Sequence, residues 1–192
     1  MKYEAEFLRY FSKVRLFSFK DARRFLKRLG ASDSYVKLFI HLQARRHGLL
    51  KIGKGYYTFV KNDASAGFAF SPFYYGLEHA LTIHKLWTQM TNPVIITASK
   101  AIPGARTSMG YEVTVRRISE KMFFGIEYVR YGGVFVPVSD VEKTLIDFLY
   151  FRIGISEDDM ESLLGASDKG KLARYSRRCN RRIGAAVKKL LA

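Results

Sequence analysis

The chain has 192 residues, of which 48% are hydrophobic, and it carries a formal net charge of +16. This hydrophobic content excludes a disordered tail, and no uncharged apolar run is long enough for a membrane span or for the core of a signal peptide. The single cysteine, Cys179, excludes an intramolecular disulfide and a paired-cysteine metal site. We therefore expect a cytoplasmic protein of one or two domains without a membrane partner.

The positive charge is concentrated at the two ends of the chain. Residues 1–62 hold 15 Lys and Arg against 4 Asp and Glu, residues 63–168 hold 9 against 13, and residues 169–192 hold 9 against none. Basic surfaces attract polyanions, because each neutralised phosphate releases condensed counterions. This distribution favours a nucleic-acid partner over a protein that is merely kept soluble by its charge.

Residues 1–62 are predicted to form a winged helix-turn-helix domain, which begins with two helices. The first spans residues 2–11. The second begins near Ser18, which has the spacing of an N-cap with Asp21, and ends at Gly30. Its basic residues share one face and its apolar residues the other, as in a helix that covers a core.

The stretch from Ser34 to Tyr57 predicts a third helix and a hairpin. Apolar residues, Leu38 among them, are expected on the buried face of this helix. Gly48 ends it, because glycine readily adopts the left-handed conformation. The β-prone runs on either side of Gly53-Lys54-Gly55 predict a hairpin with a lysine at its tip. A helix followed by such a hairpin is typical of winged helices that bind DNA.

Polar and basic residues follow one face of the third helix at helical spacing: Ser34, Lys37, His41 and Arg45. A charged row is commonly just the solvated side of a helix, but the basic second helix and the hairpin favour DNA binding. Ser34, Lys37 and His41 are expected to face base edges in the major groove. Phosphate contacts are predicted for Arg45, Lys20, Arg23 and Arg24. Lys54 is expected to reach the backbone or the minor groove.

Beyond this domain, residues 63–71 are small and polar and are interpreted as a connector. Residues 72–192 are predicted to form a second α+β domain with a small sheet, in which Pro72 opens a helix. Strands are predicted over residues 93–99, 111–118, 123–130 and 133–138, with a loop over residues 104–108. Helices are predicted after Ser139 or Asp140 and over residues 156–164.

The chain ends in a predicted long basic helix that starts near Lys169. An apolar stripe along this helix includes Cys179, which we interpret as a core residue and not as a nucleophile. Arginines occupy the rest of its surface. They predict a second polyanion-binding or antitoxin surface at Arg174, Arg178, Arg181 and Arg182.

Metal and catalytic chemistry find little support in the sequence. His79 and His84 are five residues apart, so on a helix they point about 140° away from each other. Glu142 and Lys143 resemble part of a nuclease motif, but adjacent residues at a helix start do not converge on one metal ion. We expect a structural role for them, with Asp147 pairing locally with Lys143. Neither a cofactor, a metal site nor enzymatic activity is expected.

Four segments in this order resemble the AbiEi-type antitoxins, which regulate transcription of abortive-infection (viral defence) operons: GLLKIGKGYY, SPFYYGLEHAL, NPVIITAS and VPVSDVEKTLIDFLYF. The most specific match is Val138-Ser139-x-x-Glu142-Lys143-x-Leu145-x-Asp147. The resemblance implies a repressor that binds inverted repeats of double-stranded DNA in its own promoter. It also implies that the C-terminal domain counters a nucleotidyltransferase-type toxin, in a type IV toxin–antitoxin system that requires no stable complex.

Two alternatives stay open at this stage. One is a stand-alone winged-helix transcription factor whose C-terminal domain senses a ligand or forms dimers. The other is an enzyme, such as a nuclease. The residues themselves support only the DNA-binding half of the antitoxin hypothesis.

Overall fold

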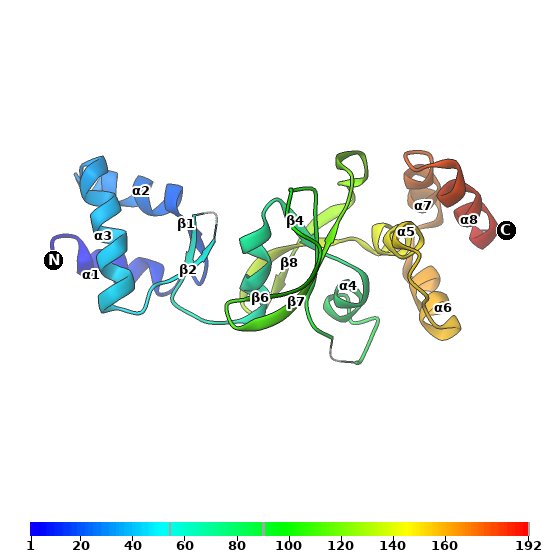
Figure 1. Ribbon diagram of the computed structural model, residues 1–192, viewed down its shortest axis with the longest axis horizontal. Helices are drawn as coiled ribbons and strands as arrows, with labels where there is room; N and C mark the ends of the chain where they lie inside the picture. Colours follow the sequence, from blue (N-terminus) through cyan, green and yellow to red (C-terminus); the bar gives the residue numbers. More distant parts are fainter. Residues whose placement is uncertain (54, 90, 192) are drawn as a thin grey trace.

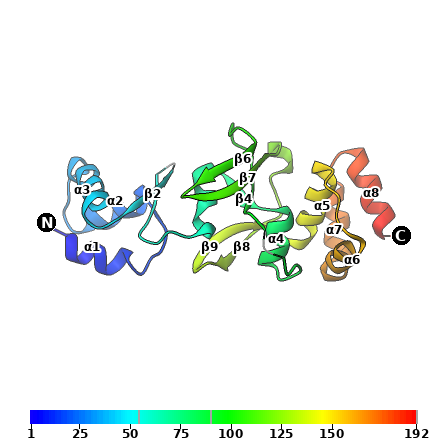
Figure 2. The same ribbon diagram turned by 60° about the horizontal axis from the view of Figure 1, so that its bottom comes forward.

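The computed structural model describes residues 1–53, 55–89 and 91–191. Three parts follow one another along an elongated molecule: helices with a small sheet, a larger central sheet, and a group of C-terminal helices (Figure 1). The two termini lie at opposite ends (Figure 2). This arrangement confirms the expected mixed α+β class. Among the described helices, none combines the length and the apolar character that a membrane span needs.

The first part contains helices and a three-stranded antiparallel sheet. Its elements are α1 (Glu4–Phe11), β1 (Phe17–Ser18), α2 (Phe19–Arg28), α3 (Asp33–Arg46), β2 (Leu50–Gly53) and β3 (Tyr56–Thr58). The strand order is β1-β3-β2. Aromatic rings fill the core, where the Phe7 ring centroid of α1 lies 5.0 Å from that of Phe39 in α3 and 6.3 Å from that of Phe25 in α2. These edge-on contacts fix the three helices against one another.

Local signals set the helix boundaries where the sequence predicts them. The Ser18 hydroxyl accepts the Asp21 N–H at 3.2 Å, while the Asp21 carboxylate accepts the Ser18 N–H at 2.9 Å, which completes a capping box at α2. Gly48, with a φ of 66°, follows α3 in the left-handed region. The pairing of β2 with β3 confirms the predicted hairpin. Its turn residue Lys54, a predicted DNA contact, lies outside the described residues.

The central part is a six-stranded mixed sheet in the order β6-β7-β5-β4-β9-β8. Its elements are η1 (Asp63–Phe70), β4 (Phe73–Tyr75), α4 (Leu77–Ile83), β5 (Val94–Thr97), β6 (Gly104–Ser108), β7 (Tyr111–Arg117), η2 (Glu120–Met122), β8 (Ile126–Tyr131) and β9 (Val134–Ser139). The prediction of a small sheet is therefore wrong. Residues 104–108 are not a loop but pair with β7 as an edge strand. Pro72 does not open a helix but precedes β4, a buried strand between β5 and β9.

The segment interpreted as a connector packs into the central core. The residues of η1 from Ala64 to Phe68 are buried. The Tyr75 hydroxyl accepts the Gly67 N–H at 2.9 Å and donates to the Ala64 carbonyl at 2.9 Å. A Cβ on Gly67 would come within 2.1 Å of the Phe73 ring. The small residues that suggested a linker are thus required by close packing.

The third part is made of helices that end the chain: α5 (Val141–Phe151), α6 (Glu157–Ala166), α7 (Lys169–Ser176) and α8 (Arg181–Leu191). The prediction of a single long basic helix is wrong, because a turn separates α7 from α8. The Asn180 side chain accepts the Ile183 N–H at 3.0 Å and so begins a new helix. Leu172 of α7 and Ile183 of α8 are buried in the same core as Leu145 of α5. Both basic helices therefore pack back onto α5.

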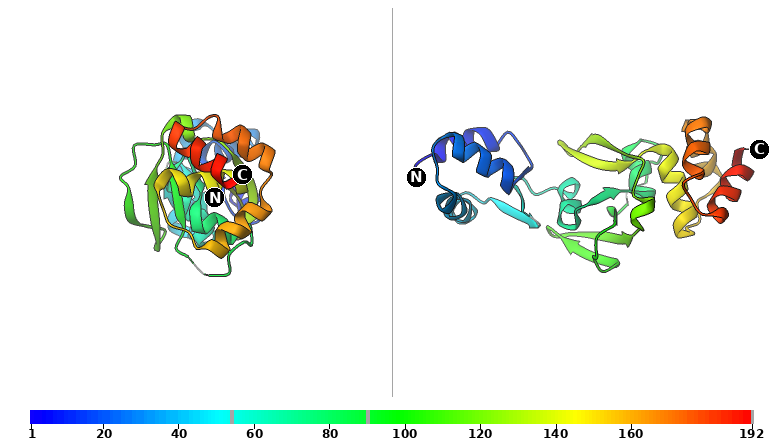
Figure 3. Two further views of the ribbon diagram at one scale, coloured as in Figure 1. Left: turned by 90° about the vertical axis from the view of Figure 1, so that its right-hand side faces the viewer. Right: turned by 90° about the horizontal axis from the view of Figure 1, so that it is seen from above.

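The central sheet also contacts the first part. The hairpin of β8 and β9 reaches back along the long axis of the molecule (Figure 3, right). At its turn, the Gly132 carbonyl accepts hydrogen bonds from the Arg15 and Asn62 side chains, both at 3.2 Å. These bonds hold the first part against the sheet and place β3 near β8.

Candidate nucleic-acid interface

Helix α3 presents a polar row on the surface of the first part. One side of the helix is buried through Val36, Phe39 and Ile40. The predicted row lies on another side, and all of its members are exposed: Ser34, Lys37, His41 and Arg45. Because they recur every three or four residues, they share one helical face. The structure thus brings the four residues together, and their contact with DNA stays a prediction.

Leu38 belongs to the same exposed face. The sequence pattern predicts a buried side chain, but Leu38 is 54% exposed. It directly follows Lys37 and precedes His41 by one helical turn. An apolar side chain in such a row can contact the methyl group of thymine. The broad run of apolar residues in α3 concealed this position, and only the packing of the helix reveals it.

Helix α2 packs against α3 and adds cations to the surface. The predicted phosphate-binding residues Lys20, Arg23 and Arg24 are exposed. Together with Lys27 and Arg28 they line a cavity of about 500 Å³, and all of its described lining residues are cationic. Phosphate oxygens are the natural ligands of such a cluster, because Arg and Lys donate to them in most protein–DNA contacts.

One acid lies between the two helices. The Asp33 carboxylate, in the first turn of α3, accepts from Arg23 Nε at 2.7 Å and from Lys27 Nζ at 3.2 Å. The hydrogen bonds from Arg23 and then from Lys27 lower the pKa of Asp33 to about 2. Arg23 therefore joins α2 to α3, which the sequence did not predict. Lys20 and Arg24 make no ion pair within the part of the chain that the structure describes.

The arginines of the predicted second surface are exposed but are distributed over α7, the following turn and α8: Arg174, Arg178, Arg181 and Arg182. Two of them also stabilise the fold. The Arg178 guanidinium lies 4.1 Å from the centroid of the Phe124 ring, a cation–π contact. Arg182 donates to the Leu149 carbonyl at 2.9 Å, near the C-terminal end of α5. Arg174 and Arg181 have no hydrogen bond or ion pair with the described residues, so they are the pair most available to a partner.

The start of α5 carries buried charges. Lys143 and Asp147 are both fully buried and form an ion pair, as the sequence predicts. The Tyr74 hydroxyl donates to Asp147 Oδ2 at 2.9 Å and accepts from Lys143 Nζ at 2.9 Å. Burial raises the pKa of Tyr74 well above its usual value, so the hydroxyl keeps its proton. The three side chains satisfy one another's hydrogen-bonding groups, which supports a structural role for them.

The acids next to this pair are also neutralised. Lys171 Nζ of α7 lies 3.2 Å from the Asp140 carboxylate and 2.7 Å from that of Glu142. Partial burial opposes the charge of Lys171, but its hydrogen bonds to both carboxylates raise its pKa above the usual 10.5. These contacts join α5 to α7. Within the described residues, no group of three or more His, Cys, Asp or Glu has a geometry that could hold a metal ion.

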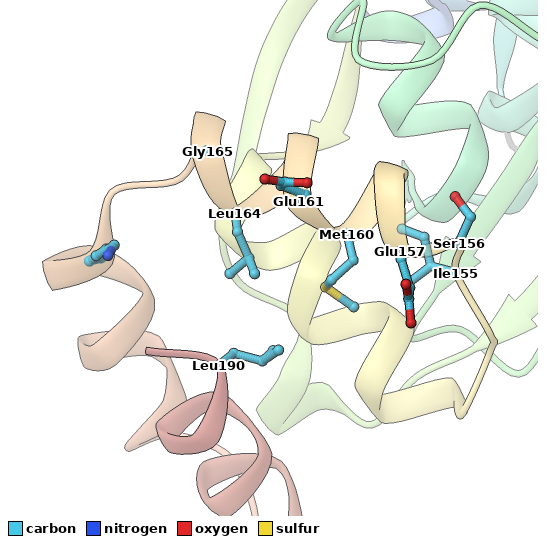
Figure 4. A pocket seen from close by; sticks show the side chains of 9 residues that line it. Ile155, Ser156, Glu157, Met160, Glu161, Leu164, Gly165 and Leu190 are labelled. Carbon is cyan, nitrogen blue, oxygen red and sulfur yellow. The ribbon is translucent and has the colours of Figure 1, made fainter. Parts of the chain in front are cut away.

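An apolar groove of about 540 Å³ lies between α6 and α8. Figure 4 shows Met160 and Leu164 from α6 and Leu190 from α8 along it, with Glu157 and Glu161 on the α6 side. Ser156 and Lys169 also line the groove. The groove can accommodate an apolar group.

No family model and no curated protein matches the chain. Among solved structures, the chain is similar to the crystal structure of the RV2827C protein from Mycobacterium tuberculosis. The TM-score is 0.55 at 12% sequence identity, over 92% of this chain and 71% of that one. At this identity the likeness shows a shared fold that spans all three parts of the molecule.

Proposed function

We propose that this chain is a winged-helix transcriptional repressor that binds inverted repeats in its own promoter and acts as the antitoxin of a type IV toxin–antitoxin system. The observation that carries the proposal is the exposed row on α3, which lies beside the cationic cluster of α2 and is followed by the β2–β3 hairpin. In a winged helix, these are the recognition helix, the supporting helix and the wing. The resemblance of the sequence to AbiEi-type antitoxins supplies the second half of the proposal.

The chain acts in this proposal as a binding protein and not as an enzyme. The carboxylates at the start of α5 are engaged by Lys143 and Lys171, which supports a structural role for them. The antitoxin activity is assigned to the C-terminal part, in which Arg174 and Arg181 are exposed.

Co-expression tests the antitoxin half of the proposal. A nucleotidyltransferase-type toxin encoded beside this gene should arrest growth, and the full chain should restore it. The Arg174→Glu/Arg181→Glu variant should restore growth less well, with Lys100→Glu as the matched control on the central part. If the neighbouring gene encodes no toxin, or if the full chain does not restore growth, the antitoxin assignment fails while the DNA-binding assignment stands.

A stand-alone winged-helix transcription factor is the second candidate. The apolar groove between α6 and α8 favours it, because a cavity of about 540 Å³ suits a small effector. In that case an apolar ligand would change promoter affinity, and Met160→Trp, which fills the groove, would abolish the response.

A further inference from the structure

The outer face of the β8–β9 hairpin carries two exposed aromatic rings. Tyr128 on β8 is 72% exposed and Phe135 on β9 is 65% exposed. Large aromatic side chains normally remove most of their surface from water. Two such rings on neighbouring strands therefore need an explanation beyond chance exposure.

The strand register places Arg130 on the same face. Tyr128 pairs with Pro137, and Arg130 pairs directly with Phe135. Side chains alternate across a strand, so Tyr128, Arg130 and Phe135 point to one side of the hairpin. Directly paired residues are about 5 Å apart, so Phe135 lies across from Arg130, and Tyr128 lies two residues away from Arg130 on the same strand. Arg130 is exposed and has no ion pair or hydrogen bond with the described residues.

Neither β8 nor β9 places an acidic side chain on this face. Glu127 is the acid of β8, and alternation turns it to the opposite face, where its carboxylate lies 3.7 Å from His84 Nδ1. The uncompensated charge of the aromatic face is therefore positive.

A cavity of about 400 Å³ adjoins the aromatic face. Its lining includes the rings of Tyr56, Phe68, Phe73, Phe123 and Tyr128. Tyr56 belongs to β3 of the first part, so the cavity extends from the wing to the central sheet. A planar group bound at the aromatic face could extend into this cavity, which is lined by aromatic rings.

We propose that the face formed by Tyr128, Arg130 and Phe135 binds single-stranded nucleic acid, with bases stacked on the two rings and a phosphate held by Arg130. Ring-on-base stacking combined with a cationic group is how proteins bind single strands without reading their sequence. A second copy of this chain fits less well, because a two-fold contact would bring the two Arg130 side chains to one interface. The site is separate from α3 and does not depend on the proposed duplex binding.

The experiment uses the full chain with Lys37→Ala, His41→Ala and Arg45→Ala, so that α3 contributes little. Fluorescence anisotropy measures its affinity for labelled single-stranded 12-mers of DNA and of RNA. Tyr128→Ala and Phe135→Ala should each weaken binding roughly 5- to 150-fold, since each lost stacking contact is worth roughly 1–3 kcal/mol. Tyr128→Phe should retain the affinity, because the ring remains. Ile102→Ala, at a side chain that is also 72% exposed, is the matched control.

A second readout reports stacking directly. A 2-aminopurine in the 12-mer should lose fluorescence when it stacks on a ring, and Tyr128→Ala/Phe135→Ala should restore the signal. An unchanged affinity of the double variant would overturn the proposal. So would a parent that sediments as a dimer and a double variant that sediments as a monomer, because the face would then be an interface between copies. Thermal melting confirms that each variant is folded.

Discussion

At the scale of single residues, Lys143 shows how the fold depends on paired charges. Its ammonium group is fully buried, contacts Asp147 and donates to the Tyr74 hydroxyl. Removing one partner of a buried ion pair leaves an uncompensated charge in a medium of low dielectric constant. We therefore expect Lys143→Met to lower the free energy of unfolding by about 3–5 kcal/mol, as measured by urea denaturation.

The double variant Lys143→Met/Asp147→Leu is the control. It removes both charges, so it should recover part of the lost stability. If the double variant loses as much unfolding free energy as Lys143→Met and Asp147→Leu lose in sum, the ion pair is not the source of the effect.

His79 gives the fold a pH dependence. His79 is 2% exposed, and its ring packs between two tyrosine rings. The ring centroid of His79 lies 4.8 Å from that of Tyr75 and 5.5 Å from that of Tyr131. Burial lowers the pKa of His79 from 6.5 to about 4, although the nearby Asp63 opposes this shift. The unfolded chain therefore takes up a proton near pH 6.5, whereas the folded chain does so only near pH 4. Above pH 6.5 the His79 ring is neutral in both states, and the free energy of unfolding has its full value. This free energy falls as the pH drops from 6.5 to about 4, because the unfolded chain binds the proton first.

The size of this effect can be measured. A shift of this magnitude corresponds to a loss of up to about 3 kcal/mol across the pH window. Urea unfolding at several pH values should show the decline, and His79→Phe, which keeps a ring but cannot titrate, should flatten it. Equal pH profiles for the parent and the variant would contradict this account.

At the scale of elements, the break between α7 and α8 depends on Asn180. Its side chain accepts the Ile183 N–H. Loss of an N-cap costs roughly 0.5–2 kcal/mol, so Asn180→Ala should destabilise the chain by that amount. Asn180→Asp, which retains the acceptor, should be close to the parent in thermal melting. If alanine has no effect, core packing alone positions α8.

Several elements could be predicted from sequence because their signals are local. The capping box of Ser18 and Asp21, the β2–β3 hairpin and the start of α5 after Asp140 all depend on residues within a few positions of one another. The alternation over residues 111–117 likewise predicts β7.

Other elements have no local signal. Strand β4 has three buried residues, too few to show a period, and it is defined by its neighbours in the sheet. Strand β6 is an edge strand in which Ser108 is the one buried residue, so it shows no hydrophobic alternation. Of the candidate site, the row on α3 could be predicted, whereas the exposure of Leu38 and the pairing of Arg23 with Asp33 depend on how α2 and α3 pack.

At the scale of the whole molecule, the two basic ends differ in their integration into the fold. The C-terminal helices bury Leu172, Ile183 and Val187 in the same core as α5. Deleting them would expose this core, so charge substitutions at Arg174 and Arg181 test their surface better than truncation does.

The cationic cluster of α2 should determine the salt dependence of duplex binding. Lys20→Ala/Arg24→Ala removes two predicted phosphate contacts without breaking the pair between Arg23 and Asp33. We expect weaker binding to all duplex sequences and a slope of log affinity against log salt that is smaller by roughly 2. An unchanged slope in anisotropy titrations would place the phosphates elsewhere.

The proposed function requires that α3 reads promoter DNA, and an anisotropy titration tests this role. Anisotropy measures the affinity of the parent and of the Lys37→Ala/His41→Ala/Arg45→Ala variant for a duplex from the region upstream of this gene, and for a scrambled duplex. Lys37 and His41 are predicted to contact bases at roughly 1–3 kcal/mol each, and Arg45 is predicted to contact a phosphate. The variant should therefore bind the promoter duplex about a hundredfold more weakly and lose most of its preference over the scrambled one. A variant that binds the promoter as tightly and as selectively as the parent would contradict the account.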